Sequence, residues 1–177
     1  MFKNLAMGAL LVFIVLALFL EIKLAFWVML GIPVCFLGAM AMISTPYIDA
    51  SLNMISIFGF ILVLGIVVDD AIIMGESAYS EVEQHGHSIE NVVNGVYRVS
   101  TPATFGVLTT IVAFMPTLFV DGVFGAFPEA CGWVVVLCLC FSLVESKWIL
   151  PAHLAHSTPS RNRILLSVDH IQEAVNR

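Results

Sequence analysis

The sequence predicts an all-α integral membrane protein whose fold is a bundle of five transmembrane helices. Of its 177 residues, 60% are hydrophobic and only 11% are charged, which lies outside the usual composition of soluble globular domains. The apolar residues gather into five runs, and about 17–25 such residues are enough for a helix to cross a bilayer. Apolar and polar residues do not alternate along these runs, so they do not resemble the strands of a transmembrane barrel.

The five runs define one membrane domain over residues 1–156, followed by a tail over residues 157–177. The first run is the shortest, because Glu21 and Lys23 interrupt it. The expected spans are residues 5–20, 24–43, 52–74, 102–120 and 128–150.

The connections between the spans are of two kinds. Residues 44–51 and 121–127 are short and contain proline or glycine, which predicts that the spans they join are antiparallel neighbours. Residues 75–100 are longer and polar, and Ser88 is expected to cap a short amphipathic connector helix there. The apolar positions of that helix are Ile89, Val92, Val93 and Val96. The tail is expected to form a second amphipathic helix on the cytoplasmic membrane surface, and the alternative for both segments is a solvated helix packed on protein.

The positions of the basic residues predict the topology. With five spans, Lys3 lies alone on one side of the membrane and the other six of the seven basic residues lie on the opposite side. The positive-inside rule then places the carboxyl terminus in the cytoplasm and the amino terminus outside it. Because the first residues are not a cleavable signal peptide, we expect the chain to be part of a longer protein.

The cysteines and histidines do not predict a metal site. The four cysteines lie in the expected spans, where a free cysteine behaves as a small hydrophobic residue. His85 and His87 lie in a polar segment without other ligand types nearby, and a solvated role is expected for them. We therefore expect no metal, no cofactor, no enzymatic activity and no nucleic-acid partner.

Two adjacent acids, Asp69 and Asp70, interrupt the third apolar run. A charged side chain at the middle of a spanning helix costs about 2.5–3.5 kcal/mol. Successive helix residues point about 100° apart, so both acids avoid lipid only if this helix is largely surrounded by protein. Another helix is expected to approach closely at the small residues Gly65 and Ala71, which flank the pair, and at Gly59 further along.

Proton binding is the chemistry that this acidic pair predicts. Removal from water and a second carboxyl nearby both favour the neutral acid, whereas a nearby Lys or Arg favours the carboxylate. No expected span carries a basic residue at the depth of Asp69 and Asp70, so a cationic partner would have to come from another part of a longer protein.

Three other roles for the pair remain as alternatives. The acids could fix helix packing through hydrogen bonds to Ser, Thr or backbone groups, or line a cation channel. They could also act in an intramembrane aspartyl protease, but that chemistry needs two carboxylates that converge, and neighbouring helix residues diverge.

Pro116 lies inside the fourth expected span. A proline within a helix frees the carbonyl four residues earlier, here that of Val112. Thr109 and Thr110 are expected to satisfy freed groups or to line a water path, and the alternative is a plain kink that neighbouring helices tolerate.

Three stretches resemble resistance-nodulation-division (RND) transporters. Residues 53–59 (NMISIFG) with 64–72 (LGIVVDDAI) look like the fourth transmembrane helix of that family. Residues 101–116 (TPATFGVLTTIVAFMP) look like the fifth, and residues 149–154 (ILPAHL) resemble the end of the sixth in one branch. The resemblance covers about residues 1–156, corresponding to spans two to six of the first half.

The resemblance implies a proton antiporter of the bacterial inner membrane, built from twelve spans in two halves with large periplasmic domains. By this resemblance Asp69 and Asp70 match the acids that take up and release protons, together with a lysine in the second half. Implied partners are the remainder of the transporter, two further copies in a homotrimer, a periplasmic adaptor, an outer-membrane channel and the lipid bilayer. The doubled acid is most similar to the hydrophobe and amphiphile efflux branch.

The sequence departs from this family pattern in two respects. Many relatives continue after the acids with Val-Val-Glu-Asn, whereas residues 73–77 here read IMGES. By the same resemblance, the first span, the periplasmic domains and the second half with its lysine are expected to lie outside residues 1–177. We therefore expect the membrane half-domain of a multidrug exporter, incomplete alone, and the alternative is a structural or assembly fragment without independent transport.

Overall fold

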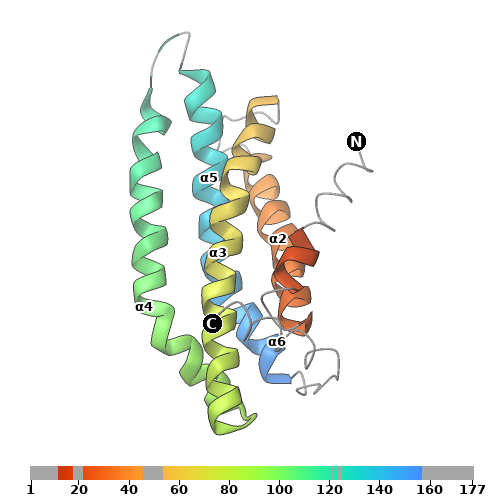
Figure 1. Ribbon diagram of the computed structural model, residues 1–177. Coiled ribbons are helices and arrows are strands. Elements are labelled where there is room, and N and C mark those ends of the chain that lie inside the picture. Colours follow the sequence, from red (N-terminus) through yellow and green to blue (C-terminus); the bar gives the residue numbers. More distant parts are fainter. Residues whose placement is uncertain (1–11, 18–21, 46–53, 121, 123–124, 157–177) are drawn as a thin grey trace, which may run out of the picture.

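The computed structural model describes residues 12–17, 22–45, 54–120, 122 and 125–156. The described residues form helices that run side by side, with α3 at the centre of the bundle (Figure 1). Residues 12–17 are helical. The other helices are α2 (Ile22–Ile43), α3 (Met54–His85), α4 (Ile89–Phe114), the 3₁₀-helix η1 (Met115–Phe119), α5 (Ala126–Val144), the π-helix η2 (Glu145–Ile149) and α6 (Leu150–His156).

The predicted class, an all-α membrane protein, is confirmed. Four helical stretches in the described part of the chain are long and apolar enough to cross a membrane. They are residues 24–43, 54–85, 89–119 and 126–156. Most of the predicted first span, residues 5–20, and the whole predicted tail helix, residues 157–177, lie outside the described residues.

The helices extend beyond the third and fourth predicted spans, and the separate connector helix was wrong. α3 continues past residue 74 to His85, and α4 already begins at Ile89, running without a break through Pro102. No glycine or proline interrupts residues 76–85, so the polar sequence continues the helix. At 1.5 Å per residue the 32 residues of α3 span about 48 Å, which exceeds a hydrocarbon core of about 30 Å.

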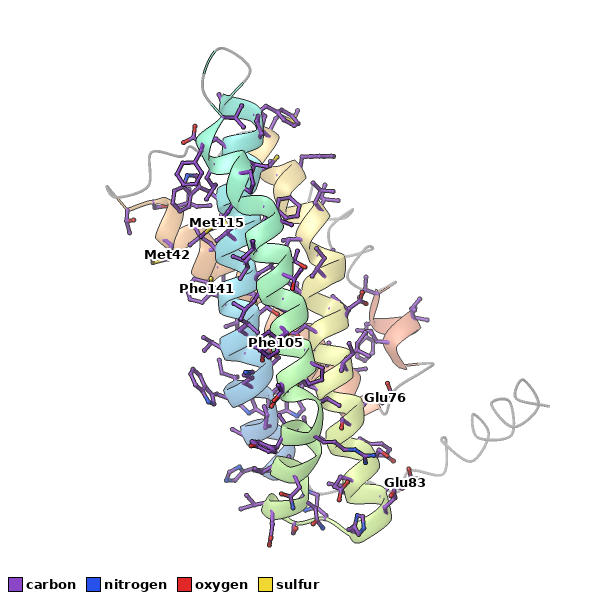
Figure 2. All side chains as sticks on the ribbon, turned by 90° about the vertical axis from the view of Figure 1, so that its left-hand side faces the viewer. Met42, Glu76, Glu83, Phe105, Met115 and Phe141 are labelled. Atoms are coloured by element: carbon purple, nitrogen blue, oxygen red, sulfur yellow. The ribbon has the colours of Figure 1, made fainter. Side chains whose placement is uncertain are left out.

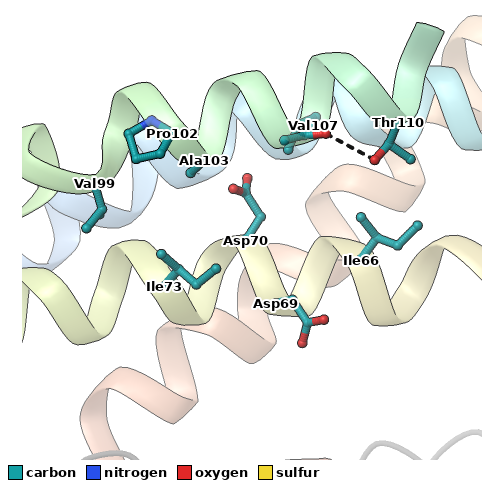
Figure 3. Close-up of a pocket in the computed structure, with 10 residues that line it drawn as sticks. Ile66, Asp69, Asp70, Ile73, Val99, Pro102, Ala103, Val107 and Thr110 are labelled. Atoms are coloured by element: carbon teal, nitrogen blue, oxygen red, sulfur yellow. Dashed lines mark hydrogen bonds between the residues drawn. The ribbon is translucent and has the colours of Figure 1, made fainter. Parts of the chain in front are cut away.

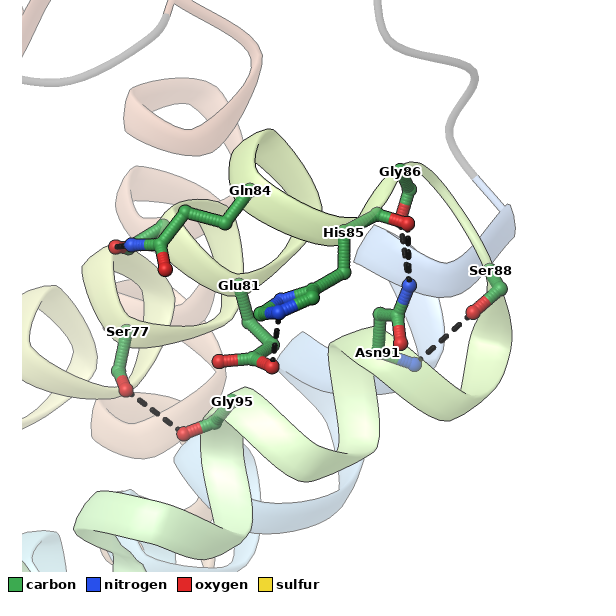
Figure 4. Close-up of polar contacts among 9 residues, drawn as sticks. Ser77, Glu81, Gln84, His85, Gly86, Ser88, Asn91 and Gly95 are labelled. Atoms are coloured by element: carbon green, nitrogen blue, oxygen red, sulfur yellow. Dashed lines mark hydrogen bonds and ion pairs between the residues drawn. The ribbon is translucent and has the colours of Figure 1, made fainter.

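A tight turn joins α3 to α4 (Figure 4). Gly86 has a φ of +88°, the left-handed conformation that commonly ends a helix. As predicted, Ser88 is the N-cap of α4, and its hydroxyl oxygen accepts a hydrogen bond of 3.1 Å from the backbone N–H of Asn91. The Asn91 side chain donates to the carbonyl oxygens of His85 and Gly86, at 3.2 and 2.8 Å. These hydrogen bonds join the start of α4 to the end of α3 and so fix the turn.

α3 and α4 are in closest contact near this turn, at Gly95. A Cβ atom at Gly95 would lie 2.6 Å from the Cα of Ala78 and from the carbonyl oxygen of Ser77. The Ser77 hydroxyl donates to the Gly95 carbonyl oxygen at 2.8 Å. A larger residue at position 95 would therefore push the two backbones apart.

The exterior of the bundle is largely apolar, as expected for helices that face lipid. Figure 2 shows Met42, Phe105 and Met115 along the upper and middle part of the bundle, and Glu76 and Glu83 near its lower end. The Phe105 side chain is 66% exposed. The long ends of α3 and α4 thus carry the polar surface beyond the apolar part.

The interior consists of two apolar clusters separated by polar side chains. The first cluster contains Val67 of α3 and Leu139 of α5, and the second contains Ala71 of α3 and Leu150 of α6. Between them lie the residues that we call the buried polar layer. They are Asp70, Ser142, Glu145 and Ser146.

Candidate functional site

The two predicted acids lie in different environments on α3. Asp70 is 5% exposed, whereas Asp69 is exposed. Figure 3 shows the two side chains pointing in different directions from the helix, as the rotation of about 100° per residue requires. Within the described part of the chain, surrounding protein therefore hides Asp70 but not Asp69.

Asp70 is held by two serines of the last span. Its Oδ2 accepts hydrogen bonds from the hydroxyls of Ser146 and Ser142, at 3.0 and 3.3 Å. The two serines are four residues apart, on adjacent turns, and both are at most 1% exposed. These are the hydrogen bonds that the packing alternative for the acids requires, and they occur at Asp70.

An open groove lies along the seam between α3 and α4, and both acids contribute to it (Figure 3). Its volume is about 460 Å³. Most of the other lining residues are apolar: Ile66, Ile73, Val99, Pro102, Ala103, Gly106, Val107 and Thr110. The groove brings two carboxyl groups and one hydroxyl into an otherwise apolar surface.

The predictions for the residues around the acids are met in part. A Cβ atom at Gly65 would meet no atom within 4 Å, so the predicted helix contact is not made among the described residues. At Gly59 the predicted close approach is made, since a Cβ there would lie 3.1 Å from Val134 Cβ on α5. Pro116 is not inside an α-helix, because α4 ends at Phe114 and Pro116 lies in the first turn of η1.

The two predicted threonines bond to their own helix. The hydroxyl of Thr109 donates to the carbonyl oxygen of Phe105 at 2.7 Å, and that of Thr110 donates to Gly106 at 3.1 Å. Neither of these bonds reaches Val112, whose carbonyl we expected Pro116 to free. Thr110 lines the groove and Thr109 does not contribute to it.

Glu145 is a buried acid that the sequence reasoning missed. It is 4% exposed, and its carboxylate lies against Gly31 of α2, in the place that a Cβ atom would occupy. It is close enough to Asp70 for the two carboxyls to interact electrostatically. The spacing of Ser142, Glu145 and Ser146, at i, i+3 and i+4, was the signal that could have indicated one polar helix face.

The acids of the site have no basic partner in the described residues. The ion pair found there within 4.0 Å joins Glu81 and His85, near the turn. Lys147 acts on Asp70 electrostatically but forms no such pair with it. A cluster of three or more metal-ligating side chains is likewise absent from the described ranges. Chemically, the arrangement offers carboxyl groups that bind protons.

Comparison with known proteins identifies relatives of this chain. The AcrB/AcrD/AcrF family model matches residues 1–161. The toluene efflux pump membrane transporter TtgE of Pseudomonas putida is 27% identical over 144 residues, which is 80% of this chain and 14% of that protein. Multidrug resistance protein MdtF of Escherichia coli is 26% identical over 153 residues, 85% of this chain and 15% of that protein.

A third relative is Protein HelA of Legionella pneumophila, 28% identical over 164 residues, 86% of this chain and 15% of that protein. The chain thus spans about one seventh of the length of these curated relatives. The match includes α2 to α6 and both acids of α3. The chain is a multi-pass membrane protein that belongs to the AcrB/AcrD/AcrF family of RND transporters.

Proposed function

We propose that this chain is the membrane portion of a proton-driven exporter of the bacterial inner membrane, in which Asp69 and Asp70 bind and release protons. The observation that carries the proposal is the position of these two acids, one exposed and one buried, on a single groove at α3. Intramembrane acids are expected to be functional by default. Relatives named as a toluene efflux pump membrane transporter and a multidrug resistance protein support export of small apolar or amphiphilic compounds.

Proton binding at Asp70 would change how α3 contacts the last span. As a carboxylate, Asp70 accepts from Ser142 and Ser146. A neutral carboxyl has one O–H donor and reduced acceptor capacity, so protonation weakens both serine hydrogen bonds, and a proton on Oδ2 itself would displace one of them. The change of proton occupancy thereby becomes a change in packing between α3 and α5.

Asp69 would serve as the accessible member of the pair. Its exposed position on the groove suits contact with a helix from the remainder of the transporter, including the lysine implied by the family resemblance. We propose that this remainder, with periplasmic domains, completes the pump and assembles as a homotrimer with an adaptor and an outer-membrane channel. In this arrangement the amino terminus is periplasmic and the carboxyl terminus is cytoplasmic.

Accumulation of radiolabelled toluene in cells tests this proposal. The whole transporter containing this chain is expressed in a host that lacks its own exporters, with and without an uncoupler that collapses the proton gradient. The native protein should lower toluene accumulation only while the gradient exists, and Asp69→Asn should abolish this effect at equal membrane abundance. Glu83→Gln, an exposed acid at the end of α3, is the matched control and should behave as native.

Two results would reject the proposal. Export by Asp69→Asn at the native level would exclude Asp69 as a proton carrier and favour a packing or assembly role. Proton entry without any export in the native transporter would instead favour the channel alternative.

A further inference from the structure

The buried polar layer contains a second acid, Glu145, that the proposed function does not use. Asp70 and Glu145 are 5% and 4% exposed, and they come from different helices. Apolar clusters lie on both sides of the layer. The two carboxyls therefore share one enclosed environment inside the bundle.

Burial makes two negative charges in this layer unfavourable. Asp70 and Glu145 interact electrostatically, and among the described residues no basic side chain forms an ion pair with either. Two like charges that are close together in a weakly polar site cannot both ionise without a large cost. A proton bound to either carboxyl would remove that cost.

The backbone at Glu145 differs from that of the rest of the span. Residues Glu145–Ile149 form a π-helix, in which the N–H of Leu150 bonds to the carbonyl oxygen of Glu145. Such π-turns are rare and frequently occur at functional sites. The wider turn keeps Glu145 and Ser146 both buried, while the next residue, Lys147, is partly exposed.

Among the described residues, no basic side chain forms an ion pair with Glu145. α2 contributes Gly31, against which the carboxylate lies, and the thiol of Cys35. α3 contributes Asp70. In its own span Lys147 acts on Asp70, and Arg98 of α4 is exposed. Asp70 is thus the ionisable group with which Glu145 would exchange a proton.

We propose that Glu145 is a third proton-binding residue of the relay, and that it shares a buried proton with Asp70. This inference rests on the proposed function. Transfer breaks the O–H bond of one carboxyl and forms an O–H bond on the other, so one becomes a carboxylate as the other becomes neutral. No electron is gained or lost. Glu145 thereby stores a proton on the closed side of α3, away from Asp69.

Infrared difference spectroscopy of the whole transporter in lipid vesicles tests the inference without any substrate. A shift from alkaline to acidic pH should produce carboxylic-acid C=O bands for both Asp70 and Glu145. Glu145→Gln should remove one of these bands and shift the pH at which the other appears by about one unit or more, because the two sites are coupled. Glutamine keeps the size and polarity of the side chain, so a purely structural role would leave the Asp70 band in place.

A second variant covers the case in which Glu145→Gln does not fold. In protein labelled with ¹³C at the aspartate carboxyls, Glu145→Asp should move one band from the unlabelled set to the labelled set. Glu83→Gln is the control and should keep the native spectrum. Spectra of Glu145→Gln or Glu145→Asp that match this control would overturn the inference.

The same vesicles separate this inference from the proposed function. If Asp69→Asn abolishes toluene-linked proton flux while Glu145→Gln leaves both flux and spectrum as in the native protein, only the role of Glu145 fails. If Asp69→Asn also keeps native flux, the proposed function itself fails.

Discussion

The two sides of α3 differ in what covers the adjacent acids. On one side, Asp70 is enclosed by the last span and held by Ser142 and Ser146. On the other side, Asp69 and Gly65 are exposed, and within the described part of the chain no other helix comes within 4 Å of the position of a Cβ at Gly65. Neighbouring residues of one helix therefore lie in different environments, since one acid is accessible and the other is retained inside the bundle.

The largest expected change in stability comes from the close packing of α3 against α4. Gly95→Ala should destabilise the chain by about 1–3 kcal/mol, because the added methyl overlaps backbone atoms of Ser77 and Ala78 and overpacking has costs of this size. Thermal unfolding of the 177-residue chain in detergent measures it. Unchanged stability would mean that the two helices do not meet at Gly95.

The next largest change in stability concerns the side of α3 on which Asp70 is buried against the last span. Ser146→Ala removes the shorter of its two hydrogen bonds, 3.0 Å against 3.3 Å for Ser142, and should cost about 1–2 kcal/mol. Ser142→Ala should cost less. The control is Ser44→Ala, since Ser44 is exposed at the end of α2, and it should be nearly neutral. An equal result for Ser146 and Ser44 would contradict the buried hydrogen bond.

Thiol labelling compares the two sides directly. In the chain in detergent, with its native cysteines replaced, Asp69→Cys should react with a charged thiol reagent at least about tenfold faster than Asp70→Cys, because thiol reactivity follows exposure and thiolate formation. The labelling rates are followed by mass spectrometry. Similar rates would show that the two acids do not lie in different environments.

The smallest expected change in stability lies on the exposed side of α3, at Gly65. Gly65→Ala meets no neighbour and should stabilise the chain by about 0.5 kcal/mol through the higher helix propensity of alanine. The same unfolding measurement detects it, and a clear loss of stability in the isolated chain would mean that Gly65 is packed after all. In the whole transporter, loss of activity in this variant would indicate that another helix covers this side.

Much of the architecture was predictable from the sequence because the bilayer demands long apolar helices. The run around Asp69 and Asp70 indicated a spanning helix, and Ser88 indicated the start of another. The length of α3 was not predictable from hydropathy, since residues 76–85 are polar but favour helix. Polarity marks where a span leaves the lipid, whereas only the turn at Gly86 marks where the helix ends.

The arrangement of the site was harder to predict than its acids. The spanning part of α3 is apolar on all sides, so the sequence gives no periodic signal for which face meets protein. Close approach was expected at both Gly65 and Gly59, and among the described residues it occurs at Gly59. Glu145 was missed because Lys147, two residues away, suggested the aqueous end of a span. Tertiary packing and the π-turn decide that Glu145 faces inward.

Substrate-linked proton flux tests the central claim most directly. The whole transporter is reconstituted in vesicles with a pH gradient, and toluene-dependent proton movement is followed for the native protein, Asp69→Asn, Asp70→Asn and Glu83→Gln at equal amounts. We predict that both aspartate variants lose the flux, by at least about a hundredfold as is usual for groups that carry protons in a reaction, while Glu83→Gln keeps it. Native flux in folded Asp69→Asn and Asp70→Asn would show that the two acids only hold α3 in the bundle.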